Sequence, residues 1–234
     1  MAAFFTVETL DFLEENRFEN SRNWFQAHHD AYKQHVLDPL NRLAEALAPI
    51  LEEIDPELLT EPRRVVSRIN RDLRYCHDGL LYRNYMWLSW HRDREAYPGW
   101  PEFYFLLSPE STCWGTGHYM PSTLTMQTLR RMILEGDPAF AAARKAAERF
   151  ELSGDKYKRT RYPQEPPELR DWLDRKALCA ERADITEAQY ANDLDTRIAA
   201  DLRALAPMYR FLVAAEERAR NEGAEGSETA FRRR

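Results

Sequence analysis

The first sixty residues carry hydrophobic side chains three or four positions apart, which is the spacing of helices that bury one face. Thr6, and then Asn20 or Ser21, are residue types that cap helices, and each precedes such a run. Asp38-Pro39 is expected to open a further helix, because proline fits the first helical position. The inward positions of that helix are Leu40, Leu43, Leu47, Ile50, Leu51 and Ile54.

After residue 62 the pattern changes to short apolar runs, rich in β-branched and aromatic residues and separated by Gly, Pro, Asp and Ser. Runs of this kind predict strands rather than helices. Four mostly antiparallel strands are expected, at residues 63–70, 85–93, 102–108 and 112–120. Residues 108–111, "SPES", predict a hairpin loop, and residues 176–182 predict an edge strand.

Helical spacing returns in the second half of the chain. Ser122, or the residue after it, is the expected cap of one helix, and Asp137-Pro138 is the expected start of the next. Thr186 and Gln189 fit a capping box that opens the last helical region.

Together these segments predict an α+β fold with N-terminal helices, a central mostly antiparallel sheet of about four to five strands, and C-terminal helices. We expect a single domain over residues 1–220, because no repeat or clean linker interrupts the pattern. Residues 221–234, "NEGAEGSETAFRRR", are expected to form a disordered tail.

Composition narrows the class of protein and of partner. Hydrophobic residues make up 44% of the chain and aromatic residues 12%, which predicts a packed globular core. The net charge of -6 argues against broad nucleic-acid binding, because that needs surplus Lys and Arg. Cys76, Cys113 and Cys179 show no C-x-x-C spacing, so we expect neither a disulfide framework nor a zinc site of the usual ligand spacing. No complete cofactor motif is present, so no cofactor is expected.

The sequence also predicts where the chain resides. No signal peptide is recognisable at the N-terminus, and no apolar run reaches the length that spans a bilayer. We therefore expect a cytoplasmic protein without a membrane partner.

Charged residues gather in the stretch 68–84, "RINRDLRYCHDGLLYRN". If residues 65–73 form one strand, the period of two places Arg71 on the same face as Ile69 and Leu73. A guanidinium held against apolar neighbours needs a carboxylate or an anionic ligand, because an unpaired buried charge costs several kcal/mol.

Two interpretations of this stretch follow. The arginines either pair with nearby aspartates and hold the fold together, or converge on a cleft and bind a phosphate or carboxylate in a bidentate way. His118, in "GTGHYMP", is a candidate base near the arginines, with a half-buried structural histidine as the alternative. The candidate ligand-binding residues are Arg68, Arg71, Asp72, Arg74, Asp78, Tyr82, Arg83 and His118.

The stretch resembles the signature of a mainly bacterial family, the domain of unknown function numbered 2461, with the pattern R-x-x-R-D-x-R-F-x-x-[D/N]-K-x-x-Y. The matching residues are Arg68, Arg71, Asp72, Arg74, Asp78 and Tyr82. Tyr75 stands at the phenylalanine position, and Gly79 replaces the lysine. The resemblance implies a single domain of about this length without an established activity or cofactor, and the missing lysine weakens any assignment as an enzyme.

Other sequence features point to chemistry less directly. Cys76 beside His77 suggests a nucleophile and its base, but adjacent side chains rarely face one another. His91 and Cys113 complete no recognised metal spacing with His77 or His118, so no metal is expected.

We weigh three functions. The first is binding of, and perhaps action on, a small phosphate- or carboxylate-bearing molecule through an arginine-rich pocket. The second is a non-enzymatic protein-interaction domain whose Arg and Asp network is structural, with an unidentified partner. The third, which the acidic charge disfavours, is nucleic-acid binding through residues 156–162 and the C-terminal arginines.

Overall fold

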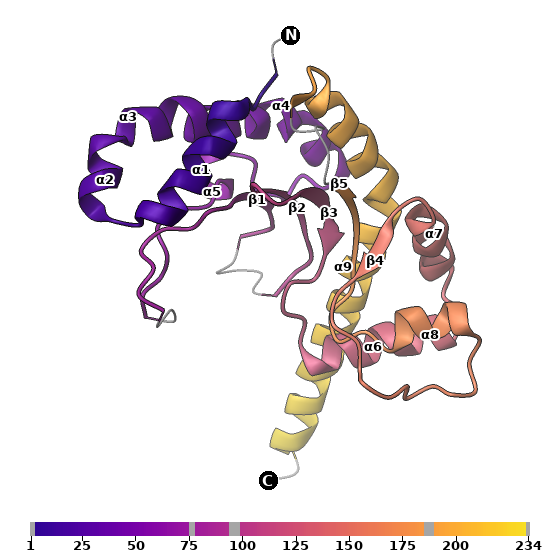
Figure 1. Ribbon diagram of the computed structural model, residues 1–234. Helices are drawn as coiled ribbons and strands as arrows, with labels where there is room; N and C mark the ends of the chain where they lie inside the picture. The colour runs from indigo at the N-terminus through magenta and orange to yellow at the C-terminus, as the bar shows by residue number, and fades with distance from the viewer. Residues whose placement is uncertain (1–2, 75–77, 94–98, 185–189, 233–234) are drawn as a thin grey trace. The chain divides into compact units, whose positions relative to one another are not determined.

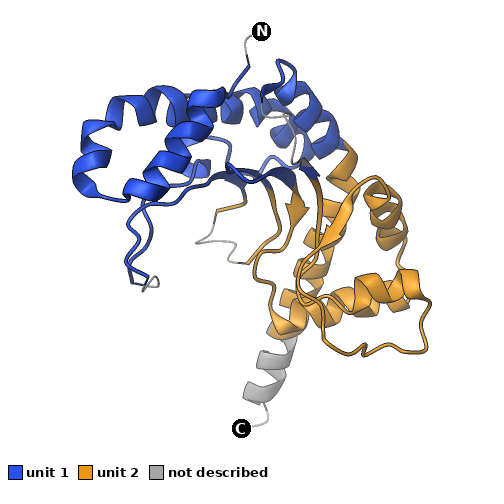
Figure 2. Ribbon diagram, viewed as in Figure 1, with its two compact units in different colours: residues 1–90, 104–114, 183–203 blue, residues 91–103, 115–182, 204–234 orange. Residues whose placement is uncertain are grey.

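The computed structural model describes residues 3–74, 78–93, 99–184 and 190–232, without the side chains of residues 184 and 224–232 (Figure 1). The chain divides into two compact units (Figure 2). Unit 1 contains Met1–Trp90, Tyr104–Trp114 and Ala183–Arg203, and unit 2 contains His91–Phe103, Gly115–Arg182 and Ala204–Arg234. The single domain expected over residues 1–220 stays a prediction.

Unit 1 begins with the expected helices. They are α1 (Val7–Glu19), α2 (Arg22–Ala27), α3 (His29–Tyr32) and α4 (Asp38–Ile54), with a π-helical turn, η1 (Lys33–Leu37), before α4. Thr6 and Thr9 form a reciprocal capping box at the start of α1. Ser21 Oγ accepts the backbone N–H of Trp24 at 3.2 Å, so Ser21 rather than Asn20 caps α2. Both predicted helix starts are confirmed.

The start of α4 differs from the prediction. Asp38-Pro39 does not open a separate helix, because η1 joins α3 directly to α4. Pro39 has no N–H to donate to the carbonyl of His35, and the Thr9 hydroxyl donates to that carbonyl at 2.7 Å instead. The proline therefore follows a π-helical turn inside a continuous helical segment.

The core of unit 1 forms around α4. Its six side chains predicted to point inward are all buried, and none is more than 9% exposed. The ring of Phe5 stacks on that of Phe105 with 5.8 Å between centroids. Trp114 Nε1 donates to Asp201 Oδ2 at 3.0 Å, so the polar edge of this buried indole has a partner.

The sheet is antiparallel, with five strands in the order β1-β2-β3-β5-β4. Their bounds are β1 Met86–Trp90, β2 Glu102–Leu107, β3 Thr112–Gly117, β4 Glu151–Ser153 and β5 Cys179–Asp184. The strands predicted within 85–93, 102–108 and 112–120 are confirmed, as is the hairpin, in which Ser108 N donates to Ser111 O at 3.0 Å. The edge position predicted for residues 176–182 is wrong, because β5 lies between β3 and the short β4, which the sequence pattern did not reveal.

Residues 63–70 do not form the predicted strand. Helix α5 spans Pro62–Val65, and the described residues after it contribute the isolated bridges Val66↔Leu88 and Asn70↔Tyr82. The backbone N–H of Trp87 donates at 2.9 Å to the Ser67 hydroxyl instead of a main-chain carbonyl, which interrupts a regular ladder.

Unit 2 carries α6 (Thr123–Leu134), α7 (Pro138–Ala147) and α8 (Pro167–Leu173), and α9 (Leu194–Arg232) crosses from unit 1 into it at residue 204. Ser122 Oγ and Asp137 Oδ1 each accept a first-turn backbone N–H, at 2.9 and 2.8 Å, which confirms these caps. The predicted capping box of Thr186 and Gln189 lies outside the described residues.

The helices and sheet together confirm the α+β class. The backbone course of α9 reaches Arg232, and the disordered tail after residue 220 stays a prediction. Among the described helices, none combines the length and apolar character needed to cross a membrane.

Candidate functional site

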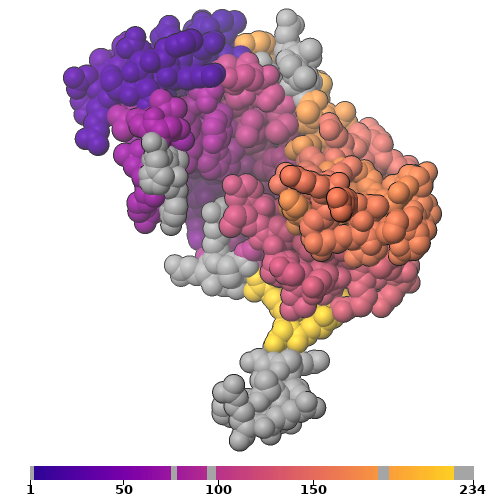
Figure 3. Space-filling model, turned by 60° about the horizontal axis from the view of Figure 1, so that its bottom comes forward, coloured from indigo at the N-terminus to yellow at the C-terminus, as the bar shows by residue number. Residues whose placement is uncertain are grey.

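The charged stretch forms an antiparallel pair of segments, residues 66–74 and 78–85, which we call the arginine ribbon. Arg71 N donates to Leu81 O, and Arg83 N donates to Ile69 O, each at 2.9 Å. The two segments run side by side in Figure 1, and the magenta atoms of this part of the chain lie at the surface in Figure 3. All predicted ligand-binding residues except His118 belong to this ribbon.

Asparagines at the C-terminal end of α1 hold the arginine ribbon against this helix. Asn20, in the left-handed conformation with φ 37°, accepts the N–H groups of Leu81 and Tyr82 at Oδ1, at 2.5 and 3.2 Å. Its Nδ2 donates to Tyr82 O at 3.2 Å, and the fully buried Asn16 donates to Arg83 O at 3.1 Å. Asn16 lies in the last turn of α1 and Asn20 caps that helix, and asparagines at these two positions are the sequence signal that could have revealed the anchor.

The anchor predicts a measurable loss of stability for Asn20→Ala. The change removes three hydrogen bonds and leaves a non-glycine residue at positive φ, so we expect about 2 kcal/mol less stability in urea unfolding. Asn20→Gly also lacks these side-chain hydrogen bonds, but glycine adopts positive φ without strain, so this variant should recover part of the lost stability. The exposed Asn23→Ala is the control, and an equal loss in both alanine variants would contradict an anchoring role.

Two arginines of the ribbon pair with its two aspartates. Arg74 donates to Asp72 through Nε and Nη2, at 2.9 and 2.6 Å, and Arg71 Nη1 donates to Asp78 Oδ2 at 2.8 Å. The Arg74 side chain is the main cause that lowers the pKa of Asp72 to about 2. The pKa of Asp78 is also lowered, mainly by the hydrogen bond from the backbone N–H of Leu80 and secondly by the hydrogen bond from Arg71. Both pairs remain in contact with solvent, so each contributes little to the stability of the fold.

Arg83 and Tyr82 also have structural partners. Arg83 Nη1 donates to the carbonyls of Arg68 and Asn70, both at 2.5 Å, and its guanidinium lies 4.8 Å from the Trp87 ring centroid. The Tyr82 ring is 6% exposed and stacks on Phe25 with 4.5 Å between centroids. These contacts give Arg83 and Tyr82 roles within the ribbon itself.

The predicted apolar face around Arg71 does not form. Ile69 is 2% exposed, but Leu73 is 47% exposed and the Arg71 side chain is 21% exposed. The parity argument fails because residues 65–73 are not a regular strand, so alternate side chains do not share one face. Arg71 is accordingly half-buried and paired with Asp78 rather than enclosed.

Arg68 differs from the other arginines of the ribbon. It is exposed, and its guanidinium forms no hydrogen bond or ion pair with any residue that the structure describes. Among the ribbon's signature residues it is therefore the one whose side chain has no structural partner in the described chain.

His118 belongs to unit 2, so the structure does not test its expected position near the arginines. It is fully buried rather than half-buried, and burial lowers its pKa to about 3. The imidazole is therefore neutral at pH 7.

The described residues test the hypotheses of a catalytic cysteine and of a metal site only in part. Cys76 and His77 lie outside them. Cys113 and Cys179 are free thiols, and burial raises the pKa of Cys179 to about 12, which disfavours a reactive thiolate. Within the described chain, no group of three His, Cys, Asp or Glu residues is arranged to hold a metal ion.

Side chains of the basic loop, residues 156–162, form contacts within unit 2. Lys156 Nζ pairs with Asp171, and the Arg161 guanidinium lies 3.7 Å from the Tyr157 ring centroid. These contacts stabilise the loop, and nucleic-acid binding through it stays the third, disfavoured hypothesis.

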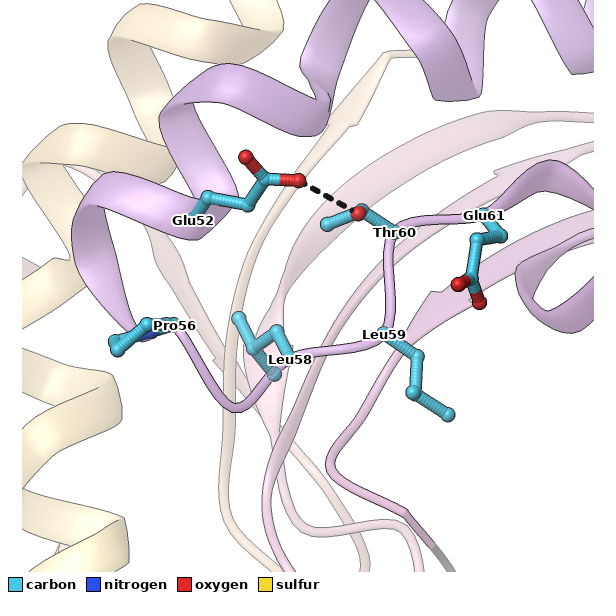
Figure 4. A pocket seen from close by; sticks show the side chains of 6 residues that line it. All are labelled: Glu52, Pro56, Leu58, Leu59, Thr60 and Glu61. Atoms are coloured by element: carbon cyan, nitrogen blue, oxygen red, sulfur yellow. Dashed lines mark hydrogen bonds between the residues drawn. The ribbon is translucent and has the colours of Figure 1, made fainter.

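A surface pocket of about 340 Å³ lies elsewhere in unit 1 (Figure 4). Its lining residues are Glu52, Pro56, Leu58, Leu59, Thr60 and Glu61. The Thr60 hydroxyl donates to Glu52 Oε1 at 2.8 Å, and none of the predicted ligand-binding residues lines the pocket. Its two carboxylates make it unsuited to an anion, so the pocket does not coincide with the predicted chemistry.

Comparison with known proteins gives one family. The model of a conserved hypothetical protein family, DUF2461, matches residues 8–211 of the 234. The match contains the whole arginine ribbon and His118. No curated protein matches the chain.

Proposed function

This chain belongs to the conserved hypothetical protein family DUF2461, and we propose that its arginine ribbon binds the phosphate or carboxylate group of a small molecule. Arg68 carries the proposal, because its exposed guanidinium has no partner in the described chain. A planar guanidinium matches the two oxygens of such a group in a bidentate way.

The charge balance of the ribbon supports an anionic ligand. Its described segments contain four arginines, at positions 68, 71, 74 and 83, and two aspartates, at positions 72 and 78. The aspartates are paired with Arg71 and Arg74. The Arg83 guanidinium donates to two backbone carbonyls. Of the four arginines, Arg68 is therefore the one whose charge is most available to an anionic ligand.

The anchoring of the ribbon supports binding as well. Asn16 and Asn20 hold the segment 81–83, and Arg83 holds the carbonyls on either side of Ile69. A segment that is already ordered loses less entropy when a ligand binds. The backbone that carries Arg68 is therefore preorganised.

A protein-interaction role is the second candidate. Leu73, Leu80 and Tyr85 on the same ribbon are 47%, 38% and 38% exposed. Apolar side chains of this size at a protein surface are suited to a partner protein, with the Arg–Asp pairs serving only to shape the ribbon.

We also propose that the protein works in the bacterial cytoplasm. The free thiols of Cys113 and Cys179 are compatible with a reducing compartment.

Thermal unfolding tests the anion proposal. Wild type is heated with phosphate, nucleotides, sugar phosphates and carboxylic acids in turn. A ligand at about 100 times its dissociation constant should add roughly 2.7 kcal/mol, or about 5 to 10 °C for a chain of this size.

Matched variants assign the effect to Arg68. Arg68→Ala should lose the shift, and Arg68→Lys should keep only part of it, because lysine retains the charge but not the planar fork. Arg42→Ala removes the same charge from an exposed position of α4 and should behave as wild type. If folded wild type and Arg68→Ala respond alike to every compound, the anion proposal is wrong and the protein-interaction role becomes the leading one.

A further inference from the structure

Unit 2 buries a second group of polar side chains, outside the arginine ribbon. His118 follows β3, Thr125 lies on α6 and Glu216 lies on α9, and their exposed fractions are 0%, 0% and 5%. Segments far apart in the sequence thus bring an imidazole, a hydroxyl and a carboxylate into one interior region.

Glu216 is fixed at both of its oxygens. Oε2 accepts the Thr125 hydroxyl at 2.6 Å, and Oε1 accepts Arg220 Nε at 2.8 Å. The Arg220 guanidinium also lies 5.1 Å from the ring centroid of Trp100. The charge of the Glu216 carboxylate is therefore balanced by Arg220, and the neutral His118 adds no charge beside it.

His118 is not satisfied in this way. Both of its ring nitrogens are buried, and neither forms a hydrogen bond within the described chain. Nε2 lies 4.0 Å from Glu216 Oε2, which is too long for a hydrogen bond. Burial lowers the pKa of His118 to about 3, so the neutral ring offers one donor and one acceptor at pH 7. Such groups are rarely left unsatisfied in a folded interior, which indicates a partner other than the described residues.

We propose that His118 Nε2 and Glu216 Oε2 bind one buried water molecule between them. An oxygen about 2.8 Å from each atom fits their separation of 4.0 Å with roughly a right angle at the oxygen. Water donates to the carboxylate and either donates to or accepts from the imidazole, as its tautomer requires.

The charge of the site favours water over a cation. Arg220 already neutralises Glu216, so an ammonium or metal ion would bring an unbalanced charge into the interior. A metal ion would also need more ligands than these, and the described residues supply no group of three His, Cys, Asp or Glu. The bound water would connect the segment after β3 to α9 within unit 2.

A crystal structure of the full chain at pH 7 tests the proposal. We expect a solvent peak within hydrogen-bonding distance of both His118 Nε2 and Glu216 Oε2. A direct hydrogen bond between the two side chains, or a metal ion at about 2.0 to 2.2 Å from them, would overturn it.

Nuclear magnetic resonance gives an independent readout in solution. The ring proton of His118, assigned from its loss in a His118→Gln variant, should show a nuclear Overhauser effect from a long-lived water. The exposed His28, whose Nδ1 lies 2.8 Å from Trp24 O, is the internal control for exchange with bulk solvent. A His118 ring without contact to water would contradict the proposal, whatever the outcome of the anion screen.

Discussion

Replacing Gly115 by alanine should destabilise the protein by about 4 kcal/mol or more, enough to prevent folding of a marginally stable chain. A Cβ at this position of β3 would lie 2.3 Å from Ala180 O and 2.8 Å from Glu181 Cα. Both contacts involve the backbone of the adjacent strand β5, so a side-chain rotation cannot relieve them. The sheet would have to separate between β3 and β5.

Circular dichroism and urea unfolding measure this loss, and Gly136→Ala is the matched control. Gly136 has φ 70° but no atom within 4 Å of an added Cβ, so its substitution should cost only about 1 kcal/mol of backbone strain. A Gly115→Ala variant as stable as Gly136→Ala would show that β3 and β5 are not packed as described.

Acidification should destabilise the protein through His118. Its pKa is about 3 in the folded chain, against an ordinary value of 6.5, so the unfolded chain takes up a proton first as the pH falls. The stability that the protein gains from holding His118 neutral is therefore fully present above about pH 6.5, and it is lost progressively as the pH falls toward 3. Between pH 7 and pH 4 the expected loss from this group is about 3 kcal/mol.

Urea unfolding of wild type and His118→Leu over this pH range isolates the contribution. Other titrating groups, such as Asp72, are present in both chains. Between pH 7 and pH 4, the free energy of unfolding of His118→Leu should therefore fall by about 3 kcal/mol less than that of wild type. The exposed His29→Leu should retain the wild-type dependence. Parallel curves for wild type and His118→Leu would mean that protonated His118 is stabilised by Glu216 and is not held neutral.

Local signals predicted much of the fold. The caps Thr6, Ser21 and Ser122 and the hairpin at residues 108–111 depend on chemistry within a few residues of the chain, and all are present. The strand expected at 63–70 depends on a partner ladder, which a sequence pattern does not contain. There the Ser67 hydroxyl replaces a backbone acceptor, and Pro62 starts a helical turn.

The candidate site was predictable in composition but not in geometry. The arginine stretch identified the ribbon, yet only the structure shows that Arg71 and Arg74 are paired within it and that Arg68 is not paired within the described chain. Asn16 and Asn20 were missed as anchors because their partners are more than sixty residues away. His118 and Glu216, which the fold brings to 4.0 Å from one another, are equally remote in sequence, 98 positions apart.

The central claim is that Arg68 binds an anionic group, and arginine side-chain nuclear magnetic resonance tests it most directly. The chain is labelled with ¹⁵N-arginine, and the Nε–H signals of Arg68 and Arg42, assigned by Arg68→Lys and Arg42→Lys, are followed during titration with phosphate, pyrophosphate and citrate. We predict a saturable shift of the Arg68 signal with at least one of these anions and none for Arg42. If no arginine of the ribbon shows a saturable shift, or if Arg42 shifts equally, the ribbon does not form a specific anion site.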